Sequence, residues 1–161
     1  IAMAVCGHPK LIIADEPTTA LDVTVQAQVL ELLKDLQKKL NTAILLITHN
    51  LGVVWEMCDT VMVMYAGKSV EYGTAEDIFD HPMHPYTQAL LSAIPEADPN
   101  KAKANQRIPI KGEIPSPINP KNCCRFAERC QHATERCFKE MPQMKEIAPG
   151  HKVACHLVED K

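Results

Sequence analysis

Two short apolar runs, separated by one amphipathic segment, constrain the fold of this chain more than any other feature. The first run, residues 10–14 (KLIIA), lies between Pro9 and the polar sequence Asp15-Glu16-Pro17. The second, residues 43–47 (AILLI), ends at Thr48-His49-Asn50. Continuous apolar runs of this length are typical of strands that are buried on both faces in a parallel sheet. We therefore expect two fully buried strands.

The segment between the two runs carries the signals of a helix. Asp22 is a suitable N-cap and Asn41 a suitable end, and the apolar side chains between them recur at helical spacing. They are Val25, Val29, Leu32, Leu33 and Leu36. Strand, helix and strand in this order predict an α/β fold with a parallel sheet. Beyond it we expect a short helix over 51–57 and strands over 60–65 and 69–72.

The chain changes character near residue 80. Residues 1–80 carry five Lys, no Arg and eleven acids, whereas residues 81–161 carry twelve cations, nine acids, ten of the twelve Pro and five of the seven Cys. We predict an α/β domain over 1–80 and a small, irregular, Pro- and Cys-rich extension over 81–161, with an extended connector at 96–122. The net charge of −3 argues against a uniformly basic nucleic-acid binder.

Polar side chains follow both predicted strands. The carboxyl ends of parallel strands form the edge where α/β sheets bind ligands. There, one carboxylate of Asp15-Glu16 can hold hydrated Mg²⁺ while the other orients or deprotonates water, and His49 can contact a phosphate or position that water. Each feature alone is more typical of a plain polar strand end or a helix cap than of a site. The combination, with Asp22 between the strands, favours a site.

These residues lie in two motifs, LIIADEPTTALD (11–22) and LLITHNLGVV (45–54). Together they resemble the C-terminal half of an ABC transporter ATP-binding subunit, a P-loop NTPase-like fold. The resemblance implies that Asp15 binds Mg²⁺ at the end of the Walker B strand and that Glu16 is the catalytic carboxylate. It also implies that 19–22, with Asp22, is the D-loop touching the opposite subunit, and that His49 faces the γ-phosphate of ATP.

Other motifs of that family are missing from this sequence. It contains no G-x-x-x-x-G-K-[ST] phosphate loop, no glutamine loop and no LSGGQ-like signature. We expect the phosphate loop and the signature to precede Ile1, which is not an initiator Met. Without the backbone nest and Lys of the phosphate loop, most of the nucleotide-binding energy is absent. We therefore expect that this chain alone does not hydrolyse ATP.

Four cysteines near the end of the chain are spaced C-x5-C-x6-C-x17-C, at Cys124, Cys130, Cys137 and Cys155. Disulfides would suit a small Cys-rich module, but the α/β half indicates a reducing compartment. Zinc sites usually show closer C-x2–4-C pairs, whereas an iron–sulfur cluster tolerates looser spacing. Spacing alone leaves cluster, zinc and unligated thiols equally open.

The sequences NCCRFAERCQHATERC (122–137), VACHL (153–157) and HPMHPYTQALLSAIPE (81–96) resemble the C-terminal extension of oligopeptide and dipeptide permease ATP-binding subunits. Some members of that family carry a [4Fe–4S] cluster in this extension. The resemblance maps its four thiolates onto Cys124, Cys130, Cys137 and Cys155, with zinc as the alternative metal and Cys123 as an additional residue.

The resemblance implies an ATP-binding, ATP-hydrolysing subunit that drives peptide uptake, peripheral to the cytoplasmic face of the inner membrane. Its implied partners are a second ATP-binding subunit, two transmembrane permease subunits and, indirectly, a peptide-binding protein, and they include no nucleic acid. Two other functions stay open for the chain itself. One is a non-catalytic remnant, and the other is a metal- or redox-sensing regulatory module built on the cysteine site.

Overall fold

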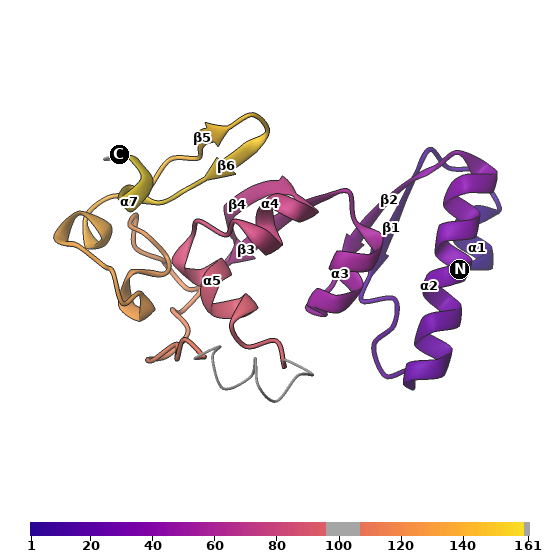
Figure 1. Cartoon of the computed structure of the whole chain (residues 1–161), viewed down its shortest axis with the longest axis horizontal. Helices are drawn as coiled ribbons and strands as arrows, with labels where there is room; N and C mark the ends of the chain where they lie inside the picture. The colour runs from indigo at the N-terminus through magenta and orange to yellow at the C-terminus, as the bar shows by residue number, and fades with distance from the viewer. Residues whose placement is uncertain (96–106, 160–161) are drawn as a thin grey trace. The chain divides into compact units, whose positions relative to one another are not determined.

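The computed structural model describes residues 1–95 and 107–159, which form two compact units, Ile1–Cys58 and Asp59–Lys161 (Figure 1). The domain boundary predicted at residue 80 rests on composition, whereas the compact units divide between Cys58 and Asp59. Part of the predicted connector, residues 96–106, lies outside the described residues. The remainder, 107–122, contains neither helix nor strand.

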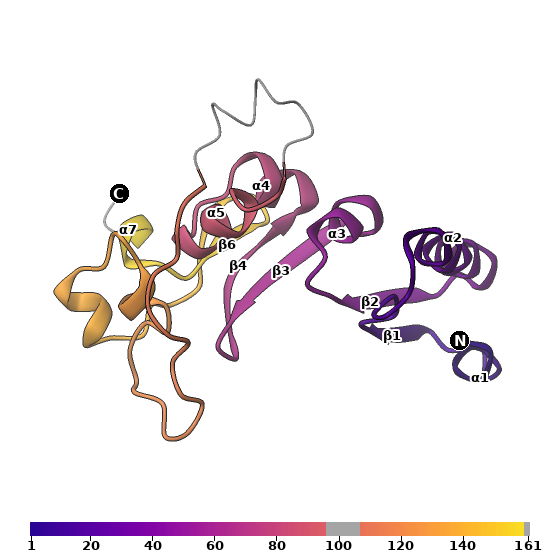
Figure 2. The same ribbon diagram turned by 90° about the horizontal axis from the view of Figure 1, so that it is seen from below.

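The first unit is built on a two-stranded parallel sheet, so the predicted α/β fold class is confirmed. Strand β1 (Leu11–Asp15) pairs with β2 (Ala43–Ile47) in a register that runs from Leu11↔Ala43 to Asp15↔Ile47. Helix α2 (Val23–Leu40) makes the crossover, preceded in the chain by α1 (Ala2–Val5) and followed by α3 (Leu51–Met57). Figure 2 shows β1 and β2 side by side, with α2 on one side of them.

Side chains at both ends fix the length of α2. The Asp22 carboxylate accepts hydrogen bonds from the backbone N–H groups of Thr24 and Val25, both at 3.0 Å. These bonds satisfy two donors that a helix N-terminus otherwise leaves unpaired. Asn41 ends the helix in the left-handed conformation, with φ 49° and ψ 46°, which asparagine tolerates better than most residues.

The expectation of two fully buried strands is wrong for the described residues. Ile12 and Ala14 are buried, but Leu11 and Ile13 are 51% and 63% exposed. Side chains alternate between the two faces of a strand. In α2, Leu30 and Leu33 are buried, so one face of the sheet is covered and the other remains open. Apolar composition alone does not reveal which face is covered.

The second unit contains an antiparallel sheet with the order β3-β4-β6-β5 (Figure 1). Strands β3 (Thr60–Tyr65) and β4 (Lys68–Thr74) correspond to the strands predicted over 60–65 and 69–72, and they pair as an antiparallel hairpin. The other two strands, β5 (Lys145–Ala148) and β6 (His151–Val153), come from the end of the chain, and β6 pairs with β4 through Glu71↔Val153 and Tyr72↔Lys152. This pairing was not predicted, and it joins the Cys-rich segment to the hairpin.

Short helices connect these strands. Helix α4 (Ala75–Asp80) begins with a capping box of Thr74 and Asp77, and α5 (Pro85–Leu91) begins at the N-cap His84. The Cys-rich segment contains two 3₁₀ turns, η1 (Ala127–Arg129) and η2 (Glu135–Phe138), and ends in α7 (His156–Glu159).

Aromatic rings fill the core of the second unit. Tyr65, at the end of β3, packs against Phe126 with ring centroids 5.1 Å apart in an edge-to-face arrangement. Tyr86 of α5 lies 4.7 Å from Tyr65 and 5.4 Å from Phe126. Edge-to-face and tilted arrangements of this kind add to the free energy of apolar burial. They tie the hairpin and α5 to the segment that bears the cysteines.

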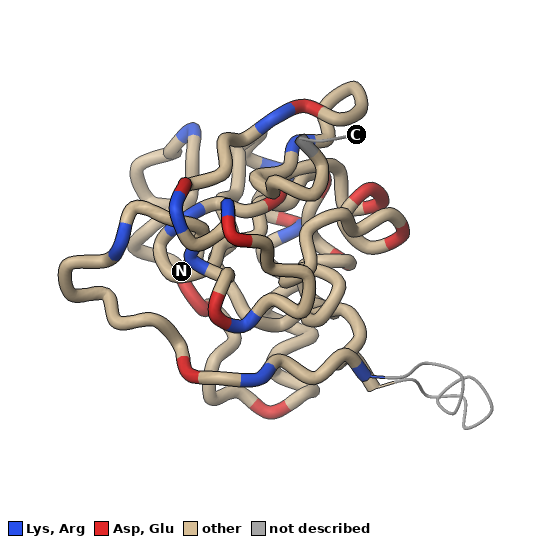
Figure 3. The backbone as a smooth tube through the Cα atoms, turned by 90° about the vertical axis from the view of Figure 1, so that its left-hand side faces the viewer, with Lys and Arg blue, Asp and Glu red and all other residues tan. Residues whose placement is uncertain are grey.

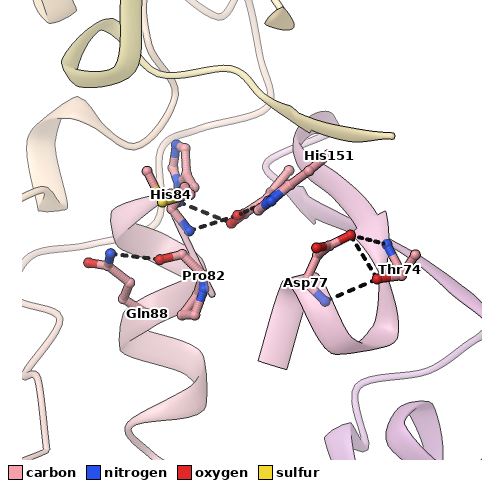
Figure 4. A network of polar contacts seen from close by, with 8 residues as sticks. Thr74, Asp77, Pro82, His84, Gln88 and His151 are labelled. Carbon is pink, nitrogen blue, oxygen red and sulfur yellow. Dashed lines mark hydrogen bonds and ion pairs between the residues drawn. The ribbon is translucent and has the colours of Figure 1, made fainter. Parts of the chain in front are cut away.

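A buried carboxylate links three segments of this unit (Figure 4). Glu71 of β4 is fully buried, and its carboxylate accepts hydrogen bonds from the backbone N–H groups of Met83 (2.7 Å) and His84 (3.0 Å). Its Oε1 also lies 2.9 Å from Nε2 of His151 in β6. A buried carboxylate with three such partners keeps the hydrogen bonds that water would otherwise provide.

His84 gives the second unit a predictable dependence on pH. Burial lowers the pKa of His84 from 6.5 to about 4. The unfolded chain therefore binds more protons than the folded chain between these values. We expect the free energy of unfolding to fall by up to about 3 kcal/mol as the pH drops from 6.5 to 4. Urea titrations followed by tyrosine near-UV circular dichroism would measure this loss.

The matched control for this prediction is His84→Asn. Asparagine does not titrate here, and it retains an acceptor for the Tyr86 N–H that Nδ1 of His84 now accepts at 3.1 Å. The variant should lose clearly less stability than the parent chain on acidification. Equal losses in the two chains would contradict the assignment to His84.

Candidate functional site

Two of the predicted site residues lie in direct contact at the carboxyl edge of the parallel sheet. Strand β1 ends at Asp15, and the next backbone N–H, that of Glu16, donates to the carbonyl of Ile47 at the end of β2, 2.8 Å away. This bond places the start of both loops side by side. As a result, Oε1 of Glu16 lies 2.7 Å from Nδ1 of His49, a residue 33 positions later in the chain.

Glu16 has an unusual backbone conformation. Its φ is 46°, in the left-handed region that residues with a Cβ rarely adopt. A bulky residue in this region is strained, and such strain is concentrated at functional sites. Because the backbone changes direction at Glu16, this residue does not continue the regular pattern in which side chains of β1 point alternately to the two faces of the sheet.

A second side chain holds the Glu16 carboxylate from the other side. The Thr19 hydroxyl donates to Oε2 at 2.9 Å, and the Thr19 N–H donates to the Glu16 carbonyl at 3.1 Å. The hydrogen bonds from His49 and Thr19 lower the pKa of Glu16 below its usual 4.5. The carboxylate is therefore ionised at neutral pH, and both of its oxygens have a partner.

Asp15 and Asp22 lie in different surroundings. Asp15 occupies an exposed position of β1, in phase with Leu11 and Ile13, and among residues 1–95 and 107–159 no side chain forms a hydrogen bond with its carboxylate. Asp22 uses one carboxylate oxygen, Oδ1, to cap α2. The structure thus brings Glu16 and His49 together, leaves Asp15 exposed to solvent, and gives Asp22 a structural role.

The described residues contain no group of three or more His, Cys, Asp or Glu side chains placed to hold a metal ion. The four cysteines predicted as metal ligands are therefore not placed as such a group. Mg²⁺ usually takes one or two carboxylates and otherwise water and substrate phosphates, and the carboxylate of Asp15 is at an exposed position.

The four predicted cysteines lie in one region of the second unit. All four are free thiols; Cys137 and Cys155 are buried, and Cys124 and Cys130 are half-buried. The N–H of Cys124 donates to the carbonyls of Cys137 (3.0 Å) and Glu140 (3.1 Å), which fixes the first and third cysteine segments against each other. Cys155 lies two residues after the end of β6, so its position depends on the pairing of β6 with β4.

The thiols influence one another electrostatically. Burial, together with the nearby thiols, raises the pKa of Cys124 and Cys130, and it raises the pKa of Cys155 to about 11. Backbone N–H groups point at the sulfurs, among them His132 to Cys130 at 3.4 Å and Thr134 to Cys137 at 3.5 Å. Hydrogen bonds of this type stabilise thiolates, so they oppose the larger effect of burial on the pKa values of Cys124, Cys130 and Cys155.

Sequence reasoning missed three contributors to these sites. Thr19 forms half of the Glu16 cradle, and only its spacing of three residues from Glu16 hints at the contact. The Glu71–His151 pair joins residues 80 positions apart, and no local pattern connects them. The N–H groups that donate to sulfur leave no sequence signal, because every residue except proline carries one.

Sequence comparison matches this chain to a family model and to curated proteins. Residues 70–137 match the family described as "Oligopeptide/dipeptide transporter, C-terminal region". The chain is 53% identical over 161 residues to the "Oligopeptide transport ATP-binding protein AppD" of Bacillus subtilis (strain 168), a match that covers 100% of this chain and 48% of that protein. It is 47% identical over 159 residues to the "Di/tripeptide transport ATP-binding protein DppF" of Pseudomonas aeruginosa (strain UCBPP-PA14), covering 99% and 48%.

These matches place the chain among transport ATP-binding proteins. Within that class, it belongs to the oligopeptide/dipeptide transporter family. The chain spans about half the length of the curated relatives it matches, 48% in both cases.

One solved structure is also similar to part of the chain. It is that of CbiO1 from Clostridium perfringens, described as part of the ABC transporter complex CbiONQ. The match is 36% identical, covers 45% of this chain and 29% of that one, and has a TM-score of 0.42. Among the helices in the described residues, none has the length and apolar character required to cross a membrane.

The two partners of Glu16 allow a direct test of the site geometry. Replacing Thr19 by Val removes one hydrogen bond to the carboxylate, so the pKa of Glu16 should rise toward its usual value. His49→Ala should raise it further, because His49 is the larger cause of the lowering. Carboxyl ¹³C NMR titration would measure both shifts.

Thr24→Val is the control, because the Thr24 hydroxyl forms no hydrogen bond with Glu16 in the described structure. This variant should leave the Glu16 titration unchanged. If His49→Ala also left it unchanged, the contact between the two side chains would not exist in solution.

Proposed function

We propose that this chain supplies the residues that promote ATP hydrolysis in an ATP-binding subunit that energises peptide import. The contact between Glu16 and His49 at the carboxyl edge of the parallel sheet carries the proposal. The relatives named as oligopeptide and di/tripeptide transport ATP-binding proteins support it, as does the order of the two motifs in the sequence.

Glu16 acts on the attacking water in this proposal. Its ionised carboxylate accepts a hydrogen bond from the water and orients it toward the γ-phosphate, while Thr19 and His49 restrict the rotation of the side chain. Because the pKa of Glu16 is lowered, the carboxylate is a weak base. Its contribution is therefore positioning and polarisation, as is usual for phosphoryl transfer.

His49 contributes through its two ring nitrogens. Nδ1 faces Glu16, and the ring is largely exposed, so Nε2 is available to a ligand. An imidazolium that donates from both nitrogens would connect Glu16 to a phosphate oxygen and stabilise the charge that develops there. Asp15 would hold Mg²⁺ through its carboxylate, and that ion would neutralise phosphate charge. Asp22 would keep the loop 19–22 in place by capping α2.

The remaining parts of the machinery belong to partners and to motifs that this sequence lacks. The sequence has no phosphate loop, so the chain alone would bind ATP weakly and would not hydrolyse it. In the working subunit, two ATP-binding subunits would close on MgATP and drive two transmembrane permease subunits. Those subunits would take up peptides delivered by a peptide-binding protein. The subunit would lie peripherally on the cytoplasmic face of the inner membrane.

The cysteine site is proposed to hold a [4Fe–4S] cluster, with zinc as the alternative. Cys124, Cys130, Cys137 and Cys155 would be the ligands, and the N–H donors at the sulfurs would favour their thiolate forms. When bound, the metal would replace the protons that the raised thiol pKa values now retain. It would also link segments that pack few large apolar side chains.

Glu16→Gln tests the catalytic assignment. In the intact subunit assembled with its permease, the variant should retain ATP binding and lose turnover by at least about a hundredfold, because an amide cannot polarise water as a carboxylate does. Steady-state phosphate release and nucleotide binding would be measured together. Glu31→Gln, at an exposed position of α2, is the matched control and should hydrolyse ATP normally. Undiminished hydrolysis in Glu16→Gln would refute the assignment.

The adjacent Cys123 and Cys124 offer a matched pair for the cysteine site. After anaerobic purification, the parent chain and Cys123→Ser should both show the visible absorbance of an iron–sulfur cluster, whereas Cys124→Ser should lose it. A colourless parent chain with stoichiometric zinc would exclude the cluster. Equal loss of absorbance in the two variants would contradict the ligand assignment.

A further inference from the structure

The second unit contains a cavity whose wall includes one of the four predicted cysteine ligands, Cys124, and otherwise residues with no role assigned so far in the ATP chemistry or in metal binding. Its volume is about 680 Å³, within the range of pockets that hold small organic ligands. It opens between the start of β4, the segment around Cys124, and the stretch from η2 to β5. All of its lining residues belong to the second unit.

Positive charge dominates the polar part of its wall. The cationic side chains that line the cavity are Lys68, Arg125, Arg136 and Lys139. Among the described lining residues the one carboxylate is Glu140, which already accepts a hydrogen bond from Nε of Arg136 at 3.0 Å. Figure 3 shows basic and acidic segments interspersed along the chain.

Two of these cations have donors available for a ligand. Lys68, at the exposed start of β4, has no ion-pair partner among the described residues. Arg125 donates from Nη1 to the carbonyl of Lys121 at 2.8 Å, but its buried Nε has no acceptor there. A buried donor without an acceptor is costly, and a bound anion near the guanidinium would offset that cost.

The rest of the wall is largely apolar or uncharged. Val70, Phe126, Met141 and Met144 line it, together with His84. His84 is neutral at physiological pH, because burial lowers its pKa to about 4. A ligand that fits this surface has a charged head at the cations and an apolar body along the remaining wall.

We propose that this cavity binds an organic phosphate, with the phosphate held by Lys68 and Arg125 and an apolar body lying against Phe126 and Met141. A dianion matches several cations better than a single carboxylate does. A bare phosphate ion would leave most of the cavity unfilled. The proposal uses none of the residues assigned to ATP hydrolysis, and its four named contacts are not cysteine ligands, although Cys124 also lines the cavity.

The ligand can come from a membrane lipid or from a dissolved metabolite, and calorimetric titration of the full chain distinguishes these sources. The probes are dihexanoylphosphatidate, glucose 6-phosphate and inorganic phosphate. We expect saturable binding of dihexanoylphosphatidate at least about tenfold tighter than that of inorganic phosphate, and weaker binding at high ionic strength. Equal affinity for glucose 6-phosphate would overturn the apolar part of the site. Absence of saturable binding by all three probes would overturn the proposal.

Two exposed lysines provide variants that should fold normally. Lys68→Gln should weaken dihexanoylphosphatidate binding by about fivefold or more, because Lys68 is assigned to the phosphate. Lys139→Gln should weaken it less, because Lys139 lines the cavity but already pairs with Glu135 at 3.2 Å. Lys152→Gln, on an exposed position of β6 outside the cavity, is the control and should bind as the parent chain does. Equal binding by Lys68→Gln, Lys139→Gln and the parent chain would show that the phosphate binds elsewhere.

Discussion

The second unit depends on a single buried carboxylate. Glu71 lies in the middle of β4, where one face of the strand meets the loop before α5 and the neighbouring strand supplies His151. Burying a carboxylate costs free energy unless each oxygen has a hydrogen-bond partner. Here the partners are two backbone N–H groups and one imidazole. Removing any one partner would leave the buried Glu71 carboxylate with one hydrogen bond fewer in an apolar interior. The hairpin, α5 and β6 are therefore coupled by a shared electrostatic requirement in addition to packing.

A hydrogen-bonded carboxylate, that of Glu16, also lies at the edge of the parallel sheet in the first unit. Because Glu16 has a left-handed backbone conformation, its side chain does not follow the alternating pattern of β1. The parallel pairing of β1 with β2 ends both strands at one edge and so brings His49 close to Glu16. The energetic contribution of such an exposed pair to folding is small. Its value lies in orientation, because a carboxylate with both oxygens engaged has few rotamers left. The strained backbone at Glu16 is tolerated since the bond from its N–H to Ile47 fixes the loop.

Local patterns predicted local structure well. The limits of α2 followed from Asp22 and Asn41, and β2, α3 and β3 coincide with the apolar runs that marked them. The contact of Glu16 with His49 was foreseeable, because parallel strands must end at one edge. The open face of β1 was not, since exposure depends on which neighbours cover a strand. The pairing of β6 with β4 was also missed: His151–Val153 is too short to carry an alternating pattern, and its partner lies far away in sequence. Cap residues and turns are encoded locally, whereas burial and long-range pairing are decided by the whole fold.

The distance along the chain between Glu71 and His151, 80 residues, has a consequence for synthesis. During synthesis, the β3–β4 hairpin leaves the ribosome well before β6, the strand that pairs with β4. Contacts between residues far apart in sequence also form slowly. During that interval the carboxylate of Glu71 has no imidazole to meet, and the edge of β4 is open to other chains. Cys155 lies two residues after β6, so the fourth thiol also takes its place only when this strand docks. The nascent chain thus passes through a stage in which the edge of β4 is unpaired and the fourth thiol is not yet beside the other three.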